Sequence, residues 1–300
     1  MTTFQNFQSH LVAGREILAC LPLVPDSRKP PLLFVHGAFS GAWMWADHFL
    51  PWFAAAGYSC YALSLRGHGG SEGRERIDWL SIPDYVADLR LAAEWIGDTP
   101  VPIGHSMGGF VVQKYLEEYD APAAALLCAV PPQGLAASQF HMLFQKPGLF
   151  LELNHIMNGH DVGLDTIREA LFAQPVSPDL LEDFRKRMQI ESQRAIWDMT
   201  MFHLPTLPFG QHPPLFIAGT EHDVMVPPFM VLATAHTYGE KAQIFPGMGH
   251  ALTHERDWEC AAAALGGWLE TKIRASAKTN ARKHAATTAK DSRARVNSLA

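Results

Sequence analysis

Short apolar segments recur along the chain and alternate with longer segments of helical periodicity. Each apolar segment is bounded by glycine, proline or polar residues, which is typical of strands buried on both faces of a sheet. A short pair of strands is also expected within the first 25 residues. We predict buried strands at 30–37, 57–65, 100–105, 123–130, 214–219 and 242–246.

Helical segments separate most of these strands. In 81–98, Ser81 can cap a helix, and Pro83 falls in the first turn, where its missing N–H is harmless. Alternation of strands and helices predicts an α/β fold with a mainly parallel sheet and helices on both faces. Further helices are expected at 107–119, at 255–272, and at 42–57 with a break at Pro51.

Residues 132–211 depart from this alternation, because they carry no strand pattern and are rich in Phe and Met. We predict a helical cap inserted into a core formed by 1–131 and 212–274. Most of its apolar residues should bury the cap against the sheet, and a minority should line an apolar pocket. No individual substrate-binding residue is assigned. Residues 275–300 are basic and poor in large apolar residues, so we expect a disordered tail.

Composition narrows the class of protein. The 300 residues are 48% apolar and 18% charged, which suits a large core and excludes a disordered or collagen-like chain. No apolar run reaches the roughly 20 residues of a membrane span. The net charge of −6 argues against nucleic acid as the main partner. Residues 272–300 carry eight basic residues against Asp291, a balance of +7, so the rest of the chain carries −13.

Other sequence features bear on location and cofactors. The N-terminus lacks the basic and apolar regions of a signal peptide, so a cytoplasmic protein is expected. Four widely spaced cysteines form no CxxC pair, and no metal-ligand spacing occurs, so we predict neither a metal site nor a cofactor. A homodimer stays open.

The segment GHSMGG at 104–109 follows a predicted strand and opens a predicted helix. In that setting, G-x-S-x-G is a nucleophile elbow, in which the serine occupies a sharp, strained turn. Gly104 and Gly108 supply the small residues that such a turn needs. The helix N-terminus offers backbone N–H groups where an oxyanion would form. We therefore predict that Ser106 is a catalytic nucleophile.

An acid and a base follow in the order that this architecture requires. Asp223 comes after the next-to-last predicted strand, and His250 comes after the last one. Catalytic groups gather at the carboxyl ends of the strands in open α/β sheets, so both residues should lie at one edge. We predict Asp223 as the acid and His250 as the base. The alternatives are Glu221 for the acid and His254 for the base.

A third motif, FVHGAFSGAWMW at 34–45, follows the first long strand. The turn at His36 and Gly37 lets the chain pass close to the serine. Gly37 alone would indicate only an ordinary turn. Together with the other motifs, it predicts that the N–H groups of Ala38 and Met107 form an oxyanion hole.

Taken together, these motifs resemble the α/β-hydrolase superfamily. HGAFSGAW, LSLRGHGGS, GHSMGG, GTEHDVMVP and GMGH occur in that family's order and span residues 30–270. The resemblance implies an α/β-hydrolase fold, an inserted helical cap and a triad of Ser106, Asp223 and His250.

Particular branches of that family can be weighed. HGAFSGAW is similar to the methyl-esterase and hydroxynitrile-lyase branch of plants. Lyases of that branch carry Thr and Lys where this chain has Gly37 and Ala251, which argues against lyase activity. Epoxide hydrolases and haloalkane dehalogenases use an Asp nucleophile, so Ser106 argues against both.

The expected function is a serine esterase that cleaves small to medium apolar carboxylic esters through an acyl-enzyme. One alternative keeps the triad but acts as a carbon–carbon bond hydrolase, a lactonase or an acyltransferase. Another is a non-catalytic receptor on the same fold. The expected partner is a small-molecule ester.

Overall fold

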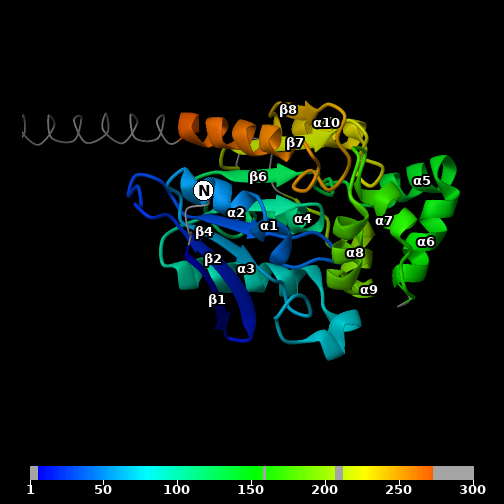
Figure 1. Ribbon diagram of the computed structural model, residues 1–300, viewed down its shortest axis with the longest axis horizontal. Coiled ribbons are helices and arrows are strands. Elements are labelled where there is room, and N and C mark those ends of the chain that lie inside the picture. Colours follow the sequence, from blue (N-terminus) through cyan, green and yellow to red (C-terminus); the bar gives the residue numbers. More distant parts are fainter. Residues whose placement is uncertain (1–5, 158–159, 207–211, 273–300) are drawn as a thin grey trace, which may run out of the picture.

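A single sheet of eight strands lies at the centre of the computed structural model, which describes residues 6–157, 160–206 and 212–272 (Figure 1). The strand order is β1-β2-β4-β3-β5-β6-β7-β8. β2 pairs antiparallel with both β1 and β4, and every other neighbouring pair is parallel. The strands are β1 (Asn6–Val12), β2 (Arg15–Leu21), β3 (Leu32–Val35), β4 (Cys60–Leu63), β5 (Val101–His105), β6 (Ala124–Leu127), β7 (Leu215–Thr220) and β8 (Ala242–Phe245).

Helices cover both faces of this sheet, as the alternating pattern predicted. In β3, Leu33 and Val35 join one buried cluster, with α3, α4 and α10, while Leu32 and Phe34 join the opposite cluster, with α1, α2 and the helix at 258–272. Among the described helices, none is long and apolar enough to cross a membrane. The labelled core helices are α1 (Trp43–Ala46), α2 (Phe49–Ala55), η1 (Arg74–Trp79), α3 (Ile82–Ile96), α4 (Met107–Tyr115) and α10 (Pro228–Tyr238).

Local chemistry explains where the helices begin. Ser81 caps α3 as predicted, and the Asp84 carboxylate accepts from the Ser81 backbone N–H, which closes a capping box. The predicted break at Pro51 is wrong, because the chain breaks at Asp47 and His48 instead. Pro51 is the third residue of α2, where its ring meets no preceding helical turn. The last helix begins at 258, three residues later than predicted.

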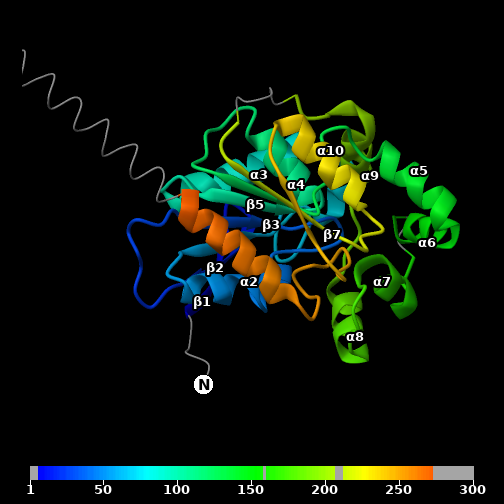
Figure 2. The same ribbon diagram turned by 90° about the horizontal axis from the view of Figure 1, so that it is seen from above.

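A helical insertion, defined as described residues 132–157 and 160–206, separates β6 from β7 and contains no strand. Its helices α5 to α8 lie beside one end of the sheet (Figures 1 and 2). That these helices form a separate cap domain stays a prediction, and the predicted tail at 275–300 lies outside the described residues. The elements are α5 (Ala136–Gln145), α6 (Pro147–Met157), α7 (Leu164–Leu171), α8 (Pro178–Arg187), α9 (Gln193–Trp197) and the π-helical turn η2 (Asp198–Phe202).

Candidate active site

Ser106 occupies the turn between the end of β5 and the start of α4. Its φ of 53° and ψ of −119° are costly for any residue other than glycine. Two backbone hydrogen bonds hold the turn in place: the Ser106 N–H donates to Leu127 O at 3.0 Å, and the Val130 N–H donates to Ser106 O at 3.1 Å. The neighbouring strand β6 and the residues after it therefore impose the strained conformation.

Two glycines allow α4 to approach β5 and β3 this closely. A Cβ atom on Gly104 would lie 2.3 Å from the carbonyl oxygen of Gly108. A Cβ atom on Gly108 would lie 2.3 Å from the carbonyl oxygen of Val35. Both contacts are with backbone atoms, so neither can relax by a side-chain rotation. This is the steric requirement for small residues that the G-x-S-x-G pattern predicted.

Asp223 and His250 lie on the loops that follow β7 and β8. His250 Nδ1 lies 2.8 Å from Asp223 Oδ2, and both side chains are buried. The other carboxylate oxygen, Oδ1, accepts from the N–H groups of Met225 and Val226, each at 2.8 Å. The carboxylate is thus held on both sides. With Nδ1–H donating to it, His250 keeps Nε2 available for a second partner.

A cavity brings the predicted nucleophile and the predicted base together. Ser106, His250 and Ala38 all line it. A Cβ atom on Gly37 would lie 3.0 Å from Ser106 Cβ, so the turn before Ala38 passes close to the serine, as predicted. Met107 follows Ser106 as the first residue of α4. The residues predicted from four separate motifs therefore meet at one edge of the sheet.

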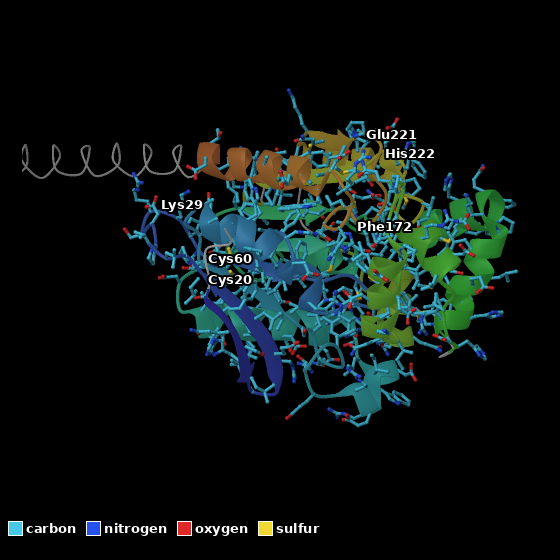
Figure 3. The ribbon with its side chains drawn as sticks, in the orientation of Figure 1. Cys20, Lys29, Cys60, Phe172, Glu221 and His222 are labelled. Carbon is cyan, nitrogen blue, oxygen red and sulfur yellow. The ribbon has the colours of Figure 1, made fainter. Side chains whose placement is uncertain are left out.

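The alternative acid and base are placed differently. Glu221 is half exposed and accepts from the Gly247 N–H at 2.9 Å. Figure 3 shows it beside His222 near the outer surface. His254 lines the cavity, but its Nε2 faces Asp47 Oδ2 at 3.6 Å. The carboxylate that contacts His250 belongs to Asp223, and the geometry favours the first assignment.

His105 supports the site in a way that the sequence did not reveal. Its Nε2 lies 2.9 Å from the carbonyl oxygen of His250. Burial, and then repulsion from His250, lowers the pKa of His105 to about 3, so the ring is neutral and Nε2–H is the donor. His105 thereby fixes the backbone of the loop that carries His250. The only sequence signal is a histidine directly before the serine, at a position that the motif leaves free.

Metal ligation is conceivable at one cluster within the described part of the chain. His105, Cys128 and His250 can bring three ligand atoms within 4.8 Å of one another. One nitrogen of each ring is already engaged, His105 Nε2 with the carbonyl oxygen of His250 and His250 Nδ1 with the Asp223 carboxylate. Burial, and then the charge of Asp223, raises the pKa of the Cys128 thiol well above its ordinary value, so the thiol stays protonated. Metals bind the thiolate, and the cluster is therefore better suited to supporting His250.

A buried ion pair fastens the helical insertion behind the turn at 36–39, which is named here the oxyanion turn after its predicted role. His68 Nε2 lies 3.0 Å from Glu191 Oε2, and neither side chain is exposed. The other Glu191 oxygen accepts from Tyr85 O–H at 2.8 Å and from the Ser192 N–H at 2.7 Å. Nearby, the Gln189 N–H donates to Phe39 O at 3.0 Å. The segment at 189–192 therefore contacts both the glycine-rich turn and the turn that carries Ala38.

The charges of this pair depend on each other. Burial opposes both charges, but attraction to Glu191 raises the pKa of His68, and His68 holds the pKa of Glu191 below its ordinary value. A raised histidine pKa stabilises the fold at low pH, and this contribution is lost as pH rises through the folded-state pKa. A lowered glutamate pKa stabilises the fold at pH values above the ordinary pKa of glutamate. This contribution is lost as pH falls through the folded-state pKa. The pair therefore contributes most to the stability of the fold between pH 4.5 and pH 6.5, the ordinary pKa values of glutamate and histidine.

Replacing Glu191 by Gln is expected to lower the free energy of unfolding by about 3–5 kcal/mol, because it leaves His68 buried without its counter-charge. Urea denaturation at pH 5.5 and at pH 9 measures the effect. The loss should be larger at pH 5.5, and an equal loss at both values would contradict the ionic interpretation. Glu182→Gln, which changes a partly exposed partner of Arg185, is the control and should shift unfolding little.

Apolar side chains from the helical insertion form much of the cavity wall. They come from α6, α7, α8 and the segments beside them, and they face the edge that carries Ser106. The sequence predicted such residues as a class but did not identify them. They include Ile156, Val162, Ile167, Leu171, Phe184 and Met188.

Comparisons with known proteins agree with this architecture. The model of the alpha/beta hydrolase family matches residues 32–263. The chain is similar to a monoacylglycerol lipase of Mycolicibacterium smegmatis (37% identity over 84 residues, 26% of this chain and 30% of that protein). It is also similar to the Oryza sativa protein named Probable esterase PIR7A (29% identity over 161 residues, 50% of this chain and 57% of that protein). These alignments span well under two thirds of either relative.

A solved structure extends the likeness to nearly the whole fold. The esterase EaEST from Exiguobacterium antarcticum has a TM-score of 0.66 at 16% identity, over 89% of this chain and all of that one. At that identity the likeness concerns the fold alone. The family match covers well over half of the 300 residues. The chain belongs to the alpha/beta hydrolase family.

Proposed function

We propose that this protein is a carboxylic-ester hydrolase that uses Ser106, His250 and Asp223 as a catalytic triad. The observation that carries the proposal is the 2.8 Å contact between His250 Nδ1 and Asp223 Oδ2, beside a cavity that Ser106 also lines. A buried carboxylate bonded to Nδ1 orients the imidazole and stabilises the imidazolium that forms during catalysis. The names of the relatives, an esterase and a monoacylglycerol lipase, support an ester as the substrate.

The mechanism has two steps. Ser106 Oγ attacks the ester carbonyl while His250 Nε2 accepts its proton, and His250 then protonates the departing alcohol. Water, activated by His250, hydrolyses the acyl-enzyme and frees the acid. The N–H groups of Ala38 and Met107 stabilise the tetrahedral oxyanion, and each such donor contributes about 3–4 kcal/mol to the transition state. This chemistry requires no cofactor.

The cavity wall supports apolar substrates. Its lining combines aliphatic side chains with Trp43 and Phe184, whose rings meet edge to face. An apolar wall with a few polar groups at one end is typical of a pocket that takes a hydrophobic group and presents one bond to the catalytic residues. We therefore propose small to medium apolar esters as the substrate class.

A fluorophosphonate probe and a substrate profile test this proposal together. We expect the probe to label Ser106 in the folded protein, because only an activated serine attacks it, and heat-unfolded protein should remain unlabelled. We expect turnover of p-nitrophenyl butyrate to exceed that of a lactone or a β-diketone. A preference for the diketone would favour carbon–carbon bond hydrolysis. Tight ester binding without turnover would favour a receptor, and either result would overturn the proposal.

A further inference from the structure

A second and larger space lies next to the catalytic cavity. The catalytic cavity measures about 80 Å³, whereas the neighbouring groove measures about 380 Å³. Side chains from α5, α6, α9 and η2 line most of this groove. Nothing in the mechanism above uses it. A long substrate group that enters the smaller catalytic cavity has this neighbouring space to extend into.

The groove begins directly beside the catalytic groups. Phe39, Leu153 and Met225 line both the groove and the catalytic cavity. Phe39 follows Ala38 in the oxyanion turn, and Met225 donates its N–H to the Asp223 carboxylate. The two spaces therefore share a wall that is built from neighbours of the catalytic residues. A flexible unbranched chain can pass such a wall more easily than a bulky ring.

The chemistry of the groove suits hydrocarbon. None of the described residues that line it is charged. The Thr200 hydroxyl donates to Ile196 O on α9 at 2.7 Å, and the Asn154 amide donates to Phe150 O within α6 at 2.7 Å, so both satisfy backbone carbonyls of the helical insertion. Met142, Met157 and Met225 add flexible walls that adapt to a chain.

We propose that this groove, named here the alkyl groove, binds a straight alkyl chain of the ester substrate. The proposal rests on the proposed function and extends its substrate class to esters with long unbranched chains. The reacting bond lies in the catalytic cavity, and the chain crosses the shared wall into the alkyl groove. Each methylene group that leaves water there strengthens binding by up to about fourfold.

Two tryptophan substitutions test the proposal from opposite walls. Gln139→Trp on α5 and Gln193→Trp on α9 each add a ring to a residue that lines the groove and is not fully buried. We expect each variant to lower kcat/KM for p-nitrophenyl dodecanoate by about tenfold or more, since several methylene groups lose their site. The value for p-nitrophenyl butyrate, whose chain stays in the catalytic cavity, should change less than about threefold. Gln8→Trp, at an exposed position of the outermost strand β1, is the matched control and should change neither value.

A second pair of substrates locates the chain within the ester. Dodecyl acetate and butyl acetate carry the variable chain on the alcohol side, whereas the p-nitrophenyl esters carry it on the acyl side. A groove-dependent loss in either pair supports the proposal and identifies the side. Folded variants that leave both long-to-short ratios unchanged would overturn it.

A binding measurement separates this proposal from the proposed function. Dodecanoic acid is titrated calorimetrically into the Ser106→Ala protein and into the same protein carrying Gln139→Trp. We expect binding at least about tenfold weaker in the second protein. If no ester is hydrolysed but this difference is found, the proposed function fails and the alkyl groove stands. Equal affinities, together with unchanged long-to-short ratios in both ester pairs, would overturn the groove even if butyrate esters are hydrolysed.

Discussion

Ser106→Ala is expected to lower kcat for p-nitrophenyl butyrate by about 10⁶-fold, the loss typical when the nucleophile of a serine triad is removed. Alanine cannot form the acyl-enzyme, and His250 then has no hydroxyl to deprotonate. The same change should abolish labelling by a fluorophosphonate probe. Initial rates and mass spectrometry of the labelled protein measure the two effects.

The fold should survive this substitution. Ser106 keeps its position through backbone hydrogen bonds to Leu127 and Val130, which alanine retains. Thermal unfolding of the variant should therefore stay close to that of the parent protein. Ser59→Ala is the matched control, because Ser59 lies before the amino end of β4, whereas Ser106 lies after the carboxyl end of β5. Residual activity of Ser106→Ala near the parent level would eliminate Ser106 as the nucleophile.

Asp223→Asn is expected to reduce kcat by about 10⁴-fold with little change in fold. The asparagine amide can donate to His250 Nδ1, which moves the ring proton to Nε2. A protonated Nε2 can no longer accept the proton of Ser106. The oxygen that receives the N–H groups of Met225 and Val226 is retained, so the loop should keep its shape. Steady-state kinetics with p-nitrophenyl butyrate measures the loss.

Glu221→Gln provides the comparison for this prediction. Glu221 was the alternative acid from the sequence, and its carboxylate faces the Gly247 backbone near the surface. We expect its replacement to leave kcat nearly unchanged. The reverse result, with a large loss for Glu221→Gln and a small one for Asp223→Asn, would transfer the role of the acid to Glu221.

The sequence was sufficient to locate the strands and to predict a mainly parallel sheet, because the central strands are buried on both faces and therefore form continuous apolar runs. Most of these strands are shorter than predicted, whereas β7 has the predicted length of six residues. The run at 57–65 includes Tyr58, which is buried but precedes β4, so burial alone does not identify a strand end. The helix at 107–119 was likewise too long, since α4 ends at Tyr115.

The sequence predicted those residues of the candidate site that follow strands, because their order along the chain is typical of this fold. Ser106, Asp223, His250, Ala38 and Met107 each stand just after a strand, and parallel strands bring their carboxyl ends to one edge. The contacts of Glu191 could not be predicted in this way. It pairs with His68 across more than a hundred residues, and only the folded helical insertion brings the two charges together. The alkyl groove is hidden for the same reason, since it lies between helices whose packing no local pattern specifies.

The position of the helical insertion has a consequence for engineering. It joins β6 to β7, whereas the proposed catalytic groups follow β3, β5, β7 and β8. A graft from another hydrolase could therefore exchange the substrate-facing walls while leaving the proposed catalytic residues in place. The donor segment must still supply a carboxylate for His68 and an N–H for Phe39 O, because residues 189–192 anchor the oxyanion turn from outside. Chimeras that keep these two anchors retain the support of the oxyanion turn, and those that drop them leave a buried histidine without its counter-charge.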